Sequence, residues 1–304
     1  MGDVDGYYLL ASSVAAVTAR ICTHPIDTIK TRLQVANVPW QPQHSRYQWF
    51  RQAVFPDMVS TSRTSAFLSL YRGLPVTLLF SVPALSVYLS CYELTKNWLD
   101  IHARWLKRDA IGNHLISGCA AEVTAGILFT PMEVMKNRLQ TDRHPTVQSR
   151  MAGRLARHIL QTEGIPGFFK GYWMGLAVFV PHTMTYFATY EELKRWAGGR
   201  TESVAQQLPF GTYLWCSTVA SVVSITLSTP LDIVKTRWQI SAAEQGTAYR
   251  QGPLAIALHM WKHEGRWRSL ARGLLARIAW GIPTTAISMT VFECLKDWRA
   301  TKSM

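Results

Sequence analysis

The chain has 304 residues, a formal net charge of +13, 48% hydrophobic residues and only 17% charged residues. This low charged fraction argues against disorder, because even a soluble fold carries about 25% charged residues. Five cysteines between Cys22 and Cys294 form no CxxC or Cys/His cluster, which excludes a disulfide framework and a structural zinc site as first interpretations.

Six long apolar stretches follow one another, at residues 7–26, 73–92, 111–132, 171–190, 208–231 and 278–292. Each reaches or approaches the roughly 20 residues that a helix needs to cross a bilayer. The second and fifth stretches contain no Asp, Glu, Lys or Arg at all. We therefore predict an all-α membrane protein with six transmembrane helices rather than a soluble helical core.

The basic residues concentrate in alternate connecting segments. Residues 27–72, 133–170 and 232–277 hold 21 of the 32 Lys and Arg but only 8 of the 19 Asp and Glu. The whole charge excess thus lies on one side of the membrane, as the positive-inside tendency describes. A nucleic-acid-binding protein can be equally basic but would not confine its surplus in this way, so no nucleic-acid partner is expected.

The pattern Pro-x-[Asp/Glu]-x-x-Lys-x-Arg-x-Gln occurs three times, beginning at Pro25, Pro131 and Pro230, which are 106 and 99 residues apart. A shorter pattern, aromatic-Glu-x-x-Lys, begins at Tyr92, Tyr190 and Phe292. Each repeat then holds two spanning helices, and three repeats must close around an axis to bury their polar stripes. We predict one transmembrane domain over 1–304, with pseudo-symmetric repeats at approximately 1–105, 106–205 and 206–304.

Small residues recur at steps of four before each proline. Such spacing lets helix backbones approach closely in lipid. The residues are Ala11, Ala15, Ala19, Ser117, Ala121, Ala125, Cys216, Ala220 and Ser224.

On these motifs the sequence resembles the mitochondrial carrier family (solute carrier family 25), over nearly the whole chain. The family's linker pattern, acidic-Gly followed by aromatic-basic-Gly, is complete in repeat two as Glu163-Gly164 and Phe169-Lys170-Gly171. The resemblance implies a solute transporter with short matrix-side helices around a central cavity. It also implies a functional monomer in the mitochondrial inner membrane, with both termini on the intermembrane-space side.

The proline motif places an acid and a base on one face of the first spanning helix of each repeat. The proline can bend that helix towards the axis. Charges at membrane depth are costly unless they are paired, so we expect each to meet the opposite charge of a neighbouring repeat. The resemblance implies that this matrix ring is a gate, with glutamines bracing it. Its members are Asp27, Lys30, Gln34, Glu133, Lys136, Gln140, Asp232, Lys235 and Gln239.

The shorter motif gives a matching cytoplasmic ring at the opposite face. For one pair alone, the simpler interpretation is an exposed salt bridge worth ~0.2–0.5 kcal/mol, but six symmetry-related pairs argue against it. Two rings cannot both be closed while solute passes, which implies alternating access. Two complete rings with their braces favour exchange over uniport. The members are Glu93, Lys96, Glu191, Lys194, Glu293 and Lys296, with Tyr92 and Tyr190 as braces.

Residues seven or eleven positions before the ring acids share their helix face, which selects Arg20 and Glu122. Two interpretations stay open for them: they bind substrate, or they pair with each other. Arg277 is a further cation if it faces inward. The remaining candidates lie on the even-numbered helices, where the resemblance places three substrate contact points at Phe80, Val178–Phe179 and Trp280, and steps of four add Tyr88, His182, Tyr186 and Ser288.

One acid and one base beside aromatic surfaces suit a small zwitterionic or carboxylate metabolite. Two other classes remain, an uncoupler-like proton or anion leak and a non-transporting membrane adaptor, although an adaptor would be expected to lose ring residues. We do not expect the protein to be an enzyme or to hold a cofactor or metal, because the sequence shows no nucleophile–base pair, phosphate-binding loop or cluster of metal ligands. Cardiolipin phosphates are expected at backbone amides beside three glycine–cation pairs, Arg72 and Gly73, Lys170 and Gly171, and Arg272 and Gly273.

Overall fold

The computed structural model describes residues 6–36, 45–55, 63–103, 107, 110–142, 148–197, 210–241, 252–263, 273–281, 283–284, 287 and 291. All regular structure in these ranges is helical, which confirms the predicted all-α class. The long helices are α1 (Gly6–Val35), α4 (Leu74–His102), α5 (Ile111–Thr141), α7 (Tyr172–Ala197) and α8 (Phe210–Ile240).

Shorter helices occupy the basic connecting segments, as the repeat predicts. They are α2 (Arg46–Val54), α3 (Arg63–Ser69), α6 (Gln148–Thr162), the 3-10 helix η1 (Ile165–Phe169) and α9 (Pro253–His263). Residues 274–281 are also helical and lead into the expected sixth span, of which residues 278–281, 283–284, 287 and 291 are described.

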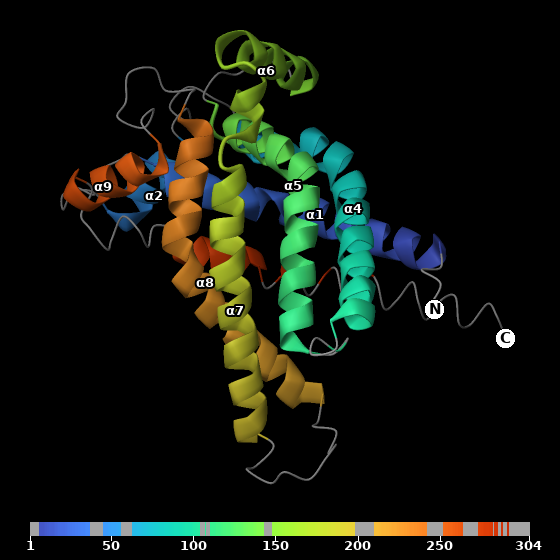
Figure 1. The fold of residues 1–304 in the computed structure, drawn as a ribbon. Helices are drawn as coiled ribbons and strands as arrows, with labels where there is room; N and C mark the ends of the chain where they lie inside the picture. The colour runs from blue at the N-terminus through green and yellow to red at the C-terminus, as the bar shows by residue number, and fades with distance from the viewer. Residues whose placement is uncertain are drawn as a thin grey trace, which may run out of the picture.

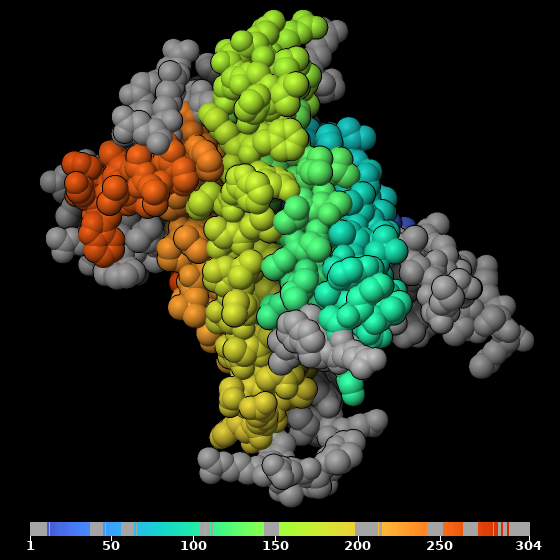
Figure 2. All heavy atoms as spheres, viewed as in Figure 1, coloured from blue at the N-terminus to red at the C-terminus, as the bar shows by residue number. Residues whose placement is uncertain are grey.

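The long helices form a bundle in which α4, α5, α7 and α8 lie side by side while α1 crosses behind (Figure 1). The most extensive packing joins α4 with α5 and α7 with α8, so helices of neighbouring repeats are paired. The space-filling view shows α7 against α5 along one face, with α6 over one end (Figure 2).

Three helical segments are long and apolar enough to cross a membrane, by length and composition. They are Ala66–His102, Gly112–Thr141 and Trp215–Ile240. The full six-span layout stays a prediction.

The small residues at steps of four are all buried. Ala11, Ala15 and Ala19 of α1 are each 1% exposed, and the matching residues of α5 and α8 are 0% exposed. Because these positions carry no bulky side chains, the backbones of neighbouring helices can pack closely against α1, α5 and α8. The pattern therefore marks the buried faces of α1, α5 and α8.

Apolar clusters hold short helices against the ends of α1 and α8. Leu33 of α1 packs with Val54 of α2 and Leu70, and Ile233 of α8 packs with Ile256 and Met260 of α9. Helix α2 begins at a capping box in which Ser45 and Gln48 satisfy each other's backbone amides. This packing fixes the ends of the helices that carry the proline motif.

Candidate functional site

Three ion pairs join α1, α5 and α8, the first long helix of each repeat, in a cycle. The Nζ of Lys136 lies 2.9 Å from Asp27 Oδ2, and the Nζ of Lys235 lies 2.6 Å from Glu133 Oε2. The cycle is completed by Lys30, whose Nζ lies 3.4 Å from Oδ2 of Asp232. Each helix thus supplies a lysine to one neighbour and a carboxylate to the other, which is the arrangement expected for the matrix ring.

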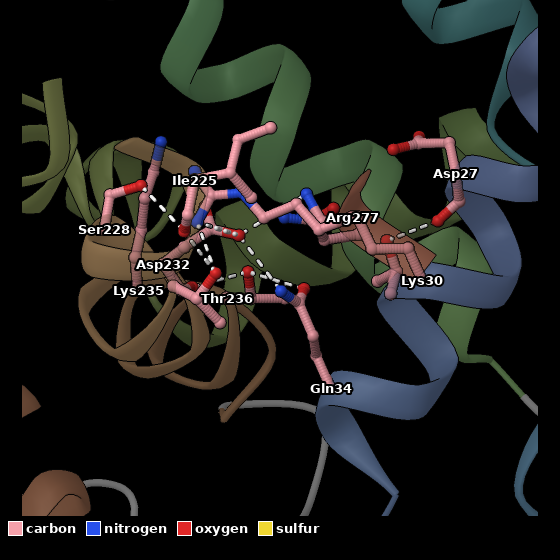
Figure 3. A network of polar contacts seen from close by, with 12 residues as sticks. Asp27, Lys30, Gln34, Ile225, Ser228, Asp232, Lys235, Thr236 and Arg277 are labelled. Carbon is pink, nitrogen blue, oxygen red and sulfur yellow. Dashed lines mark hydrogen bonds and ion pairs between the residues drawn. The ribbon is translucent and has the colours of Figure 1, made fainter. Parts of the chain in front are cut away.

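The three glutamines add a second contact to each carboxylate. Gln140 donates to Asp27 at 3.1 Å, Gln239 donates to Glu133 at 3.2 Å and Gln34 donates to Asp232 at 3.0 Å (Figure 3). All three glutamines are 0% exposed. Because each glutamine lies one turn after the lysine of its own helix, one helix holds its neighbour's carboxylate with two side chains.

A row of arginines adds a link that the sequence reasoning missed. The Nε atoms of Arg32, Arg138 and Arg237 each donate at 2.9 Å to a backbone carbonyl, and the acceptors are Gln140, Gln239 and Gln34. In each case the acceptor is the carbonyl of the glutamine that braces the matrix ring from the neighbouring repeat, so these bonds link α1 to α5, α5 to α8 and α8 to α1. The signal was available, since this arginine recurs in all three copies of the motif.

Glu163 and Lys170 of the complete linker motif in repeat two form a charge cluster with Arg138 in the last turn of α5. Arg138 donates to both carboxylate oxygens of Glu163, at 2.7 and 3.0 Å, and Lys170 lies 2.8 Å from the same carboxylate. Burial raises the pKa of the Glu163 carboxyl, but the hydrogen bonds from Arg138 and Lys170 outweigh it and hold that pKa below its ordinary value. In repeat one, which lacks the acid, Arg32 bonds the carbonyls of Val54 and Ser69 instead.

The three glycines expected to bind lipid pack against the matrix ring. Gly73, Gly171 and Gly273 have left-handed φ angles of 86°, 85° and 78°. A Cβ atom at Gly171 would lie 3.1 Å from Gln239 Cγ, and one at Gly273 would lie 3.1 Å from Gln34 Cγ. Both the φ angle and the close approach favour glycine there.

The two described cations beside these glycines have protein partners. Arg72 donates to the carbonyl of Asp142 at 2.7 Å, and Lys170 is paired with Glu163. Arg272 lies outside the described residues. Lipid binding at these positions stays a prediction.

At the opposite end of the bundle, the two described lysines of the cytoplasmic ring, Lys96 and Lys194, contact residues of their own helices. Lys194 lies 3.2 Å from Glu191, three residues earlier, and 5.4 Å from the Tyr190 ring centroid. Lys96 lies 5.7 Å from the Tyr92 ring centroid. Glu293 and Lys296 lie outside the described residues, so this ring is described only in part.

Tyr92 has a partner that the sequence reasoning did not identify. Its hydroxyl lies 2.6 Å from His114 Nδ1 on α5, a hydrogen bond between neighbouring repeats. The expected role of Tyr92 as a brace of the cytoplasmic ring stays a prediction.

A cavity of about 310 Å³ lies directly on the matrix ring. Its lining includes Arg20, Glu122, Trp280 and Arg277 together with the ring charges, and its volume suits a small metabolite. Among the described residues, Arg20 and Glu122 form no ion pair or hydrogen bond with each other or with another side chain. The structure therefore leaves both charges directed at the cavity and does not support their mutual pairing.

The other described substrate candidates lie outside this lining. Phe80 packs against the cluster of Val76, Met132 and Leu139, and Val178 is 8% exposed. Phe179 lies in contact distance of Gly118, since a Cβ there would be 3.5 Å from its ring.

The polar candidates contact tyrosines of the cytoplasmic ring or the next helix. Tyr88 stacks on Tyr92 and Tyr186 stacks on Tyr190. His182 Nδ1 lies 3.0 Å from the hydroxyl of Ser224 and 3.3 Å from that of Ser228, both on α8. Ser288 lies outside the described residues.

Comparison with known proteins follows the three repeats. The family model described as mitochondrial carrier protein matches residues 6–102, 107–201 and 206–303. The chain is 32% identical to an uncharacterized mitochondrial carrier of Schizosaccharomyces pombe, over 97% of this chain and 98% of that protein. It is 28% identical to mitochondrial thiamine pyrophosphate carrier 1 of Phaeosphaeria nodorum, over 94% of this chain and 90% of that protein. It is 27% identical to the succinate/fumarate mitochondrial transporter of Saccharomyces cerevisiae, over 95% of this chain and 90% of that protein.

Proposed function

Because the chain belongs to the mitochondrial carrier family, we propose that it exchanges a small zwitterionic or carboxylate metabolite across the mitochondrial inner membrane by alternating access. Members of this family are transporters of small molecules and not enzymes. The names of two relatives, which specify succinate/fumarate and thiamine pyrophosphate, agree with an anionic group on the solute.

The observation that carries the proposal is the closed matrix ring. Three cross-repeat ion pairs close the matrix ring, whereas Lys96 and Lys194 of the cytoplasmic ring contact tyrosines of their own helices. A pore whose matrix end is closed by three cross-repeat ion pairs corresponds to one of the two end states that alternating access requires.

The energetics of the ring favour exchange. Breaking a buried ion pair without a replacement partner costs about 3–5 kcal/mol, and three such pairs close this ring. Interactions of the solute with the cavity must offset this cost during the conversion, so an empty carrier converts slowly. Arg20 and Glu122 are the substrate residues in this mechanism, since each presents an unpaired charge to the cavity, and Trp280 adds an aromatic face.

The proposal includes the surroundings of the carrier. It works as a monomer with both termini in the intermembrane space. Cardiolipin phosphates bind to the backbone amides that follow Gly73, Gly171 and Gly273.

The test is exchange measured in liposomes that contain the purified protein and a panel of labelled metabolites. Wild type is expected to exchange at least one carboxylate or zwitterion, with net flux much slower than exchange. Arg20→Ala and Glu122→Ala are each expected to reduce that exchange. Equal rates of net flux and exchange, or unchanged kinetics in both variants, would refute the mechanism. Proton flux without metabolite exchange would instead identify a leak, and no flux of any kind would identify an adaptor.

A further inference from the structure

Helix α9 carries two histidines one turn apart. His259 and His263 have ring centroids 4.9 Å apart, with the ring planes tilted by 39°. Residues at i and i+4 lie on the same face of a helix, so this contact follows from their spacing in the sequence. Helix α9 lies beside α8 at the edge of the bundle, and neither histidine lines the central cavity (Figure 1). The pair is therefore separate from the candidate substrate site.

The separation of the two rings matches that of two imidazoles that share one metal ion. A Zn–N bond of about 2.0–2.1 Å puts the metal about 3.2 Å from the centroid of each ring, because the nitrogen lies about 1.2 Å from that centroid. The two centroids are then about 4.5 Å apart for a square-planar N–metal–N angle and about 5.2 Å apart for a tetrahedral one. The observed 4.9 Å lies between these values, so the chelate forms without a shift of the backbone.

The helix that carries the pair is already held in place. Ile256 and Met260 of α9 are each 0% exposed and pack against Ile233 and Val234 of α8. Because the helix is formed and docked, a metal that binds to it restricts side chains but no backbone. His263 is exposed and His259 is partly exposed, so an ion reaches both rings from solvent.

The pair is a feature of repeat three. Counted back from the acidic-Gly pair of each linker, His259 corresponds to His158 of α6, and His263 corresponds to Thr162. Thr162 donates its hydroxyl hydrogen to the carbonyl of His158 at 2.7 Å. Repeat two thus has the first histidine without the second, so the threefold symmetry of the fold does not account for the pair.

Imidazole nitrogen selects the kind of ion that would bind. It suits Cu²⁺, Ni²⁺ and Zn²⁺, whereas the hard ions Mg²⁺ and Ca²⁺ prefer oxygen ligands. Among the described residues, no group of three or more His, Cys, Asp and Glu side chains is placed to hold a metal. Two nitrogen ligands leave the other coordination positions to water, which distinguishes this pair from a structural zinc site with four protein ligands.

We propose that His259 and His263 bind one divalent transition-metal ion, Zn²⁺ or Cu²⁺, as a two-nitrogen chelate on the surface of α9. The ion links the last turn of α9 to the turn before it, which stabilises the folded helix in its docked position. Any ligand that binds the folded state better than the unfolded chain raises the melting temperature. The site does not depend on the proposed transport function.

The test is thermal unfolding of the full-length protein, purified in detergent without a histidine tag and titrated with zinc chloride or with magnesium chloride. Wild type is expected to be stabilised by Zn²⁺ and not by Mg²⁺. A protonated imidazole cannot bind a metal, so the stabilisation by Zn²⁺ should weaken as the solution is acidified. Electron paramagnetic resonance of bound Cu²⁺ should show two nitrogen ligands in wild type and one in each single variant.

The single variants His259→Gln and His263→Gln should each raise the half-saturating Zn²⁺ concentration at least tenfold, about 1.4 kcal/mol of binding free energy. The double variant should lose little more than either single variant, because one substitution already breaks the chelate. Two histidines that bound zinc independently would instead give losses that multiply to about a hundredfold.

The matched control is His158→Gln, which removes the corresponding histidine of α6 and should respond to Zn²⁺ as wild type does. Lys262→Gln removes an exposed positive charge next to the pair and should tighten Zn²⁺ binding about two- to threefold. A wild-type response to Zn²⁺ no larger than that to Mg²⁺, or histidine variants that respond as wild type does, overturns the inference. Every readout is metal binding by the purified protein, so failure of the transport proposal leaves this inference standing, and the converse also holds.

Discussion

The ion pair between Asp27 and Lys136 is the sharpest test of the matrix ring, because both side chains are nearly buried, at 7% and 11% exposure, and their charged atoms are 2.9 Å apart. At an effective dielectric constant of 20, the Coulomb energy at that distance is about 6 kcal/mol before desolvation is subtracted. Asp27→Asn leaves the Lys136 ammonium buried without its partner, which costs about 3–5 kcal/mol. Lys136→Gln removes the ion-pair partner of Asp27 and keeps the hydrogen bond from Gln140, so its cost is similar.

The double variant Asp27→Asn/Lys136→Gln should recover more than half of the loss, since it buries no unpaired charge. Each single variant should lower the melting temperature of the detergent-solubilised protein by about 6–10 °C, at about 2 °C per kcal/mol for a chain of this size. The matched control is the pair of Glu192 and Arg195, 3.3 Å apart and 74% exposed on both sides, for which negligible coupling is expected. Additive losses in the buried cycle would refute the claim that this pair holds the ring together.

Two further outcomes follow from the packing and the linker. Gly126→Ala should lower the free energy of unfolding by about 1–3 kcal/mol, because the new Cβ would lie 2.9 Å from the Tyr172 ring. The control is Gly153→Ala, whose new Cβ would have nothing within 4 Å. In a thermal melt this control should be neutral or stabilising. Glu163→Gln should destabilise the protein at neutral pH, because the lowered pKa of this carboxyl means that its ionised form is stabilised in the folded state. That contribution is complete above the unfolded pKa of about 4.3 and is lost as pH falls through the lower folded pKa, so the melting temperatures of wild type and variant should approach each other as pH falls below about 4.3. If the melting temperatures of wild type and Glu163→Gln changed with pH in parallel, ionised Glu163 would not be the source of this stability.

Much of the matrix ring could be predicted from sequence for a physical reason. The acid, the lysine and the glutamine lie at the same distances from each motif proline, so helix geometry alone puts them in register on α1, α5 and α8. Charges at membrane depth need partners, and threefold recurrence leaves the neighbouring repeat as the natural source. The small residues at steps of four likewise mark the closely packed faces of these helices, and all of them are buried.

Other contacts depend on how far neighbouring helices slide and turn against each other, which no spacing within one helix determines. That relative placement puts Arg20 and Glu122 on the cavity wall without pairing them, and it brings His114 to the hydroxyl of Tyr92. It also decides that the cation four residues after Gly273 reaches the carboxylate already held by Lys30. The sequence by itself determined the repeat, its helices and the residues that need partners. Only the tertiary structure decided which partners they find, because side-chain reach is a few ångströms and a fraction of a helical turn changes the neighbour.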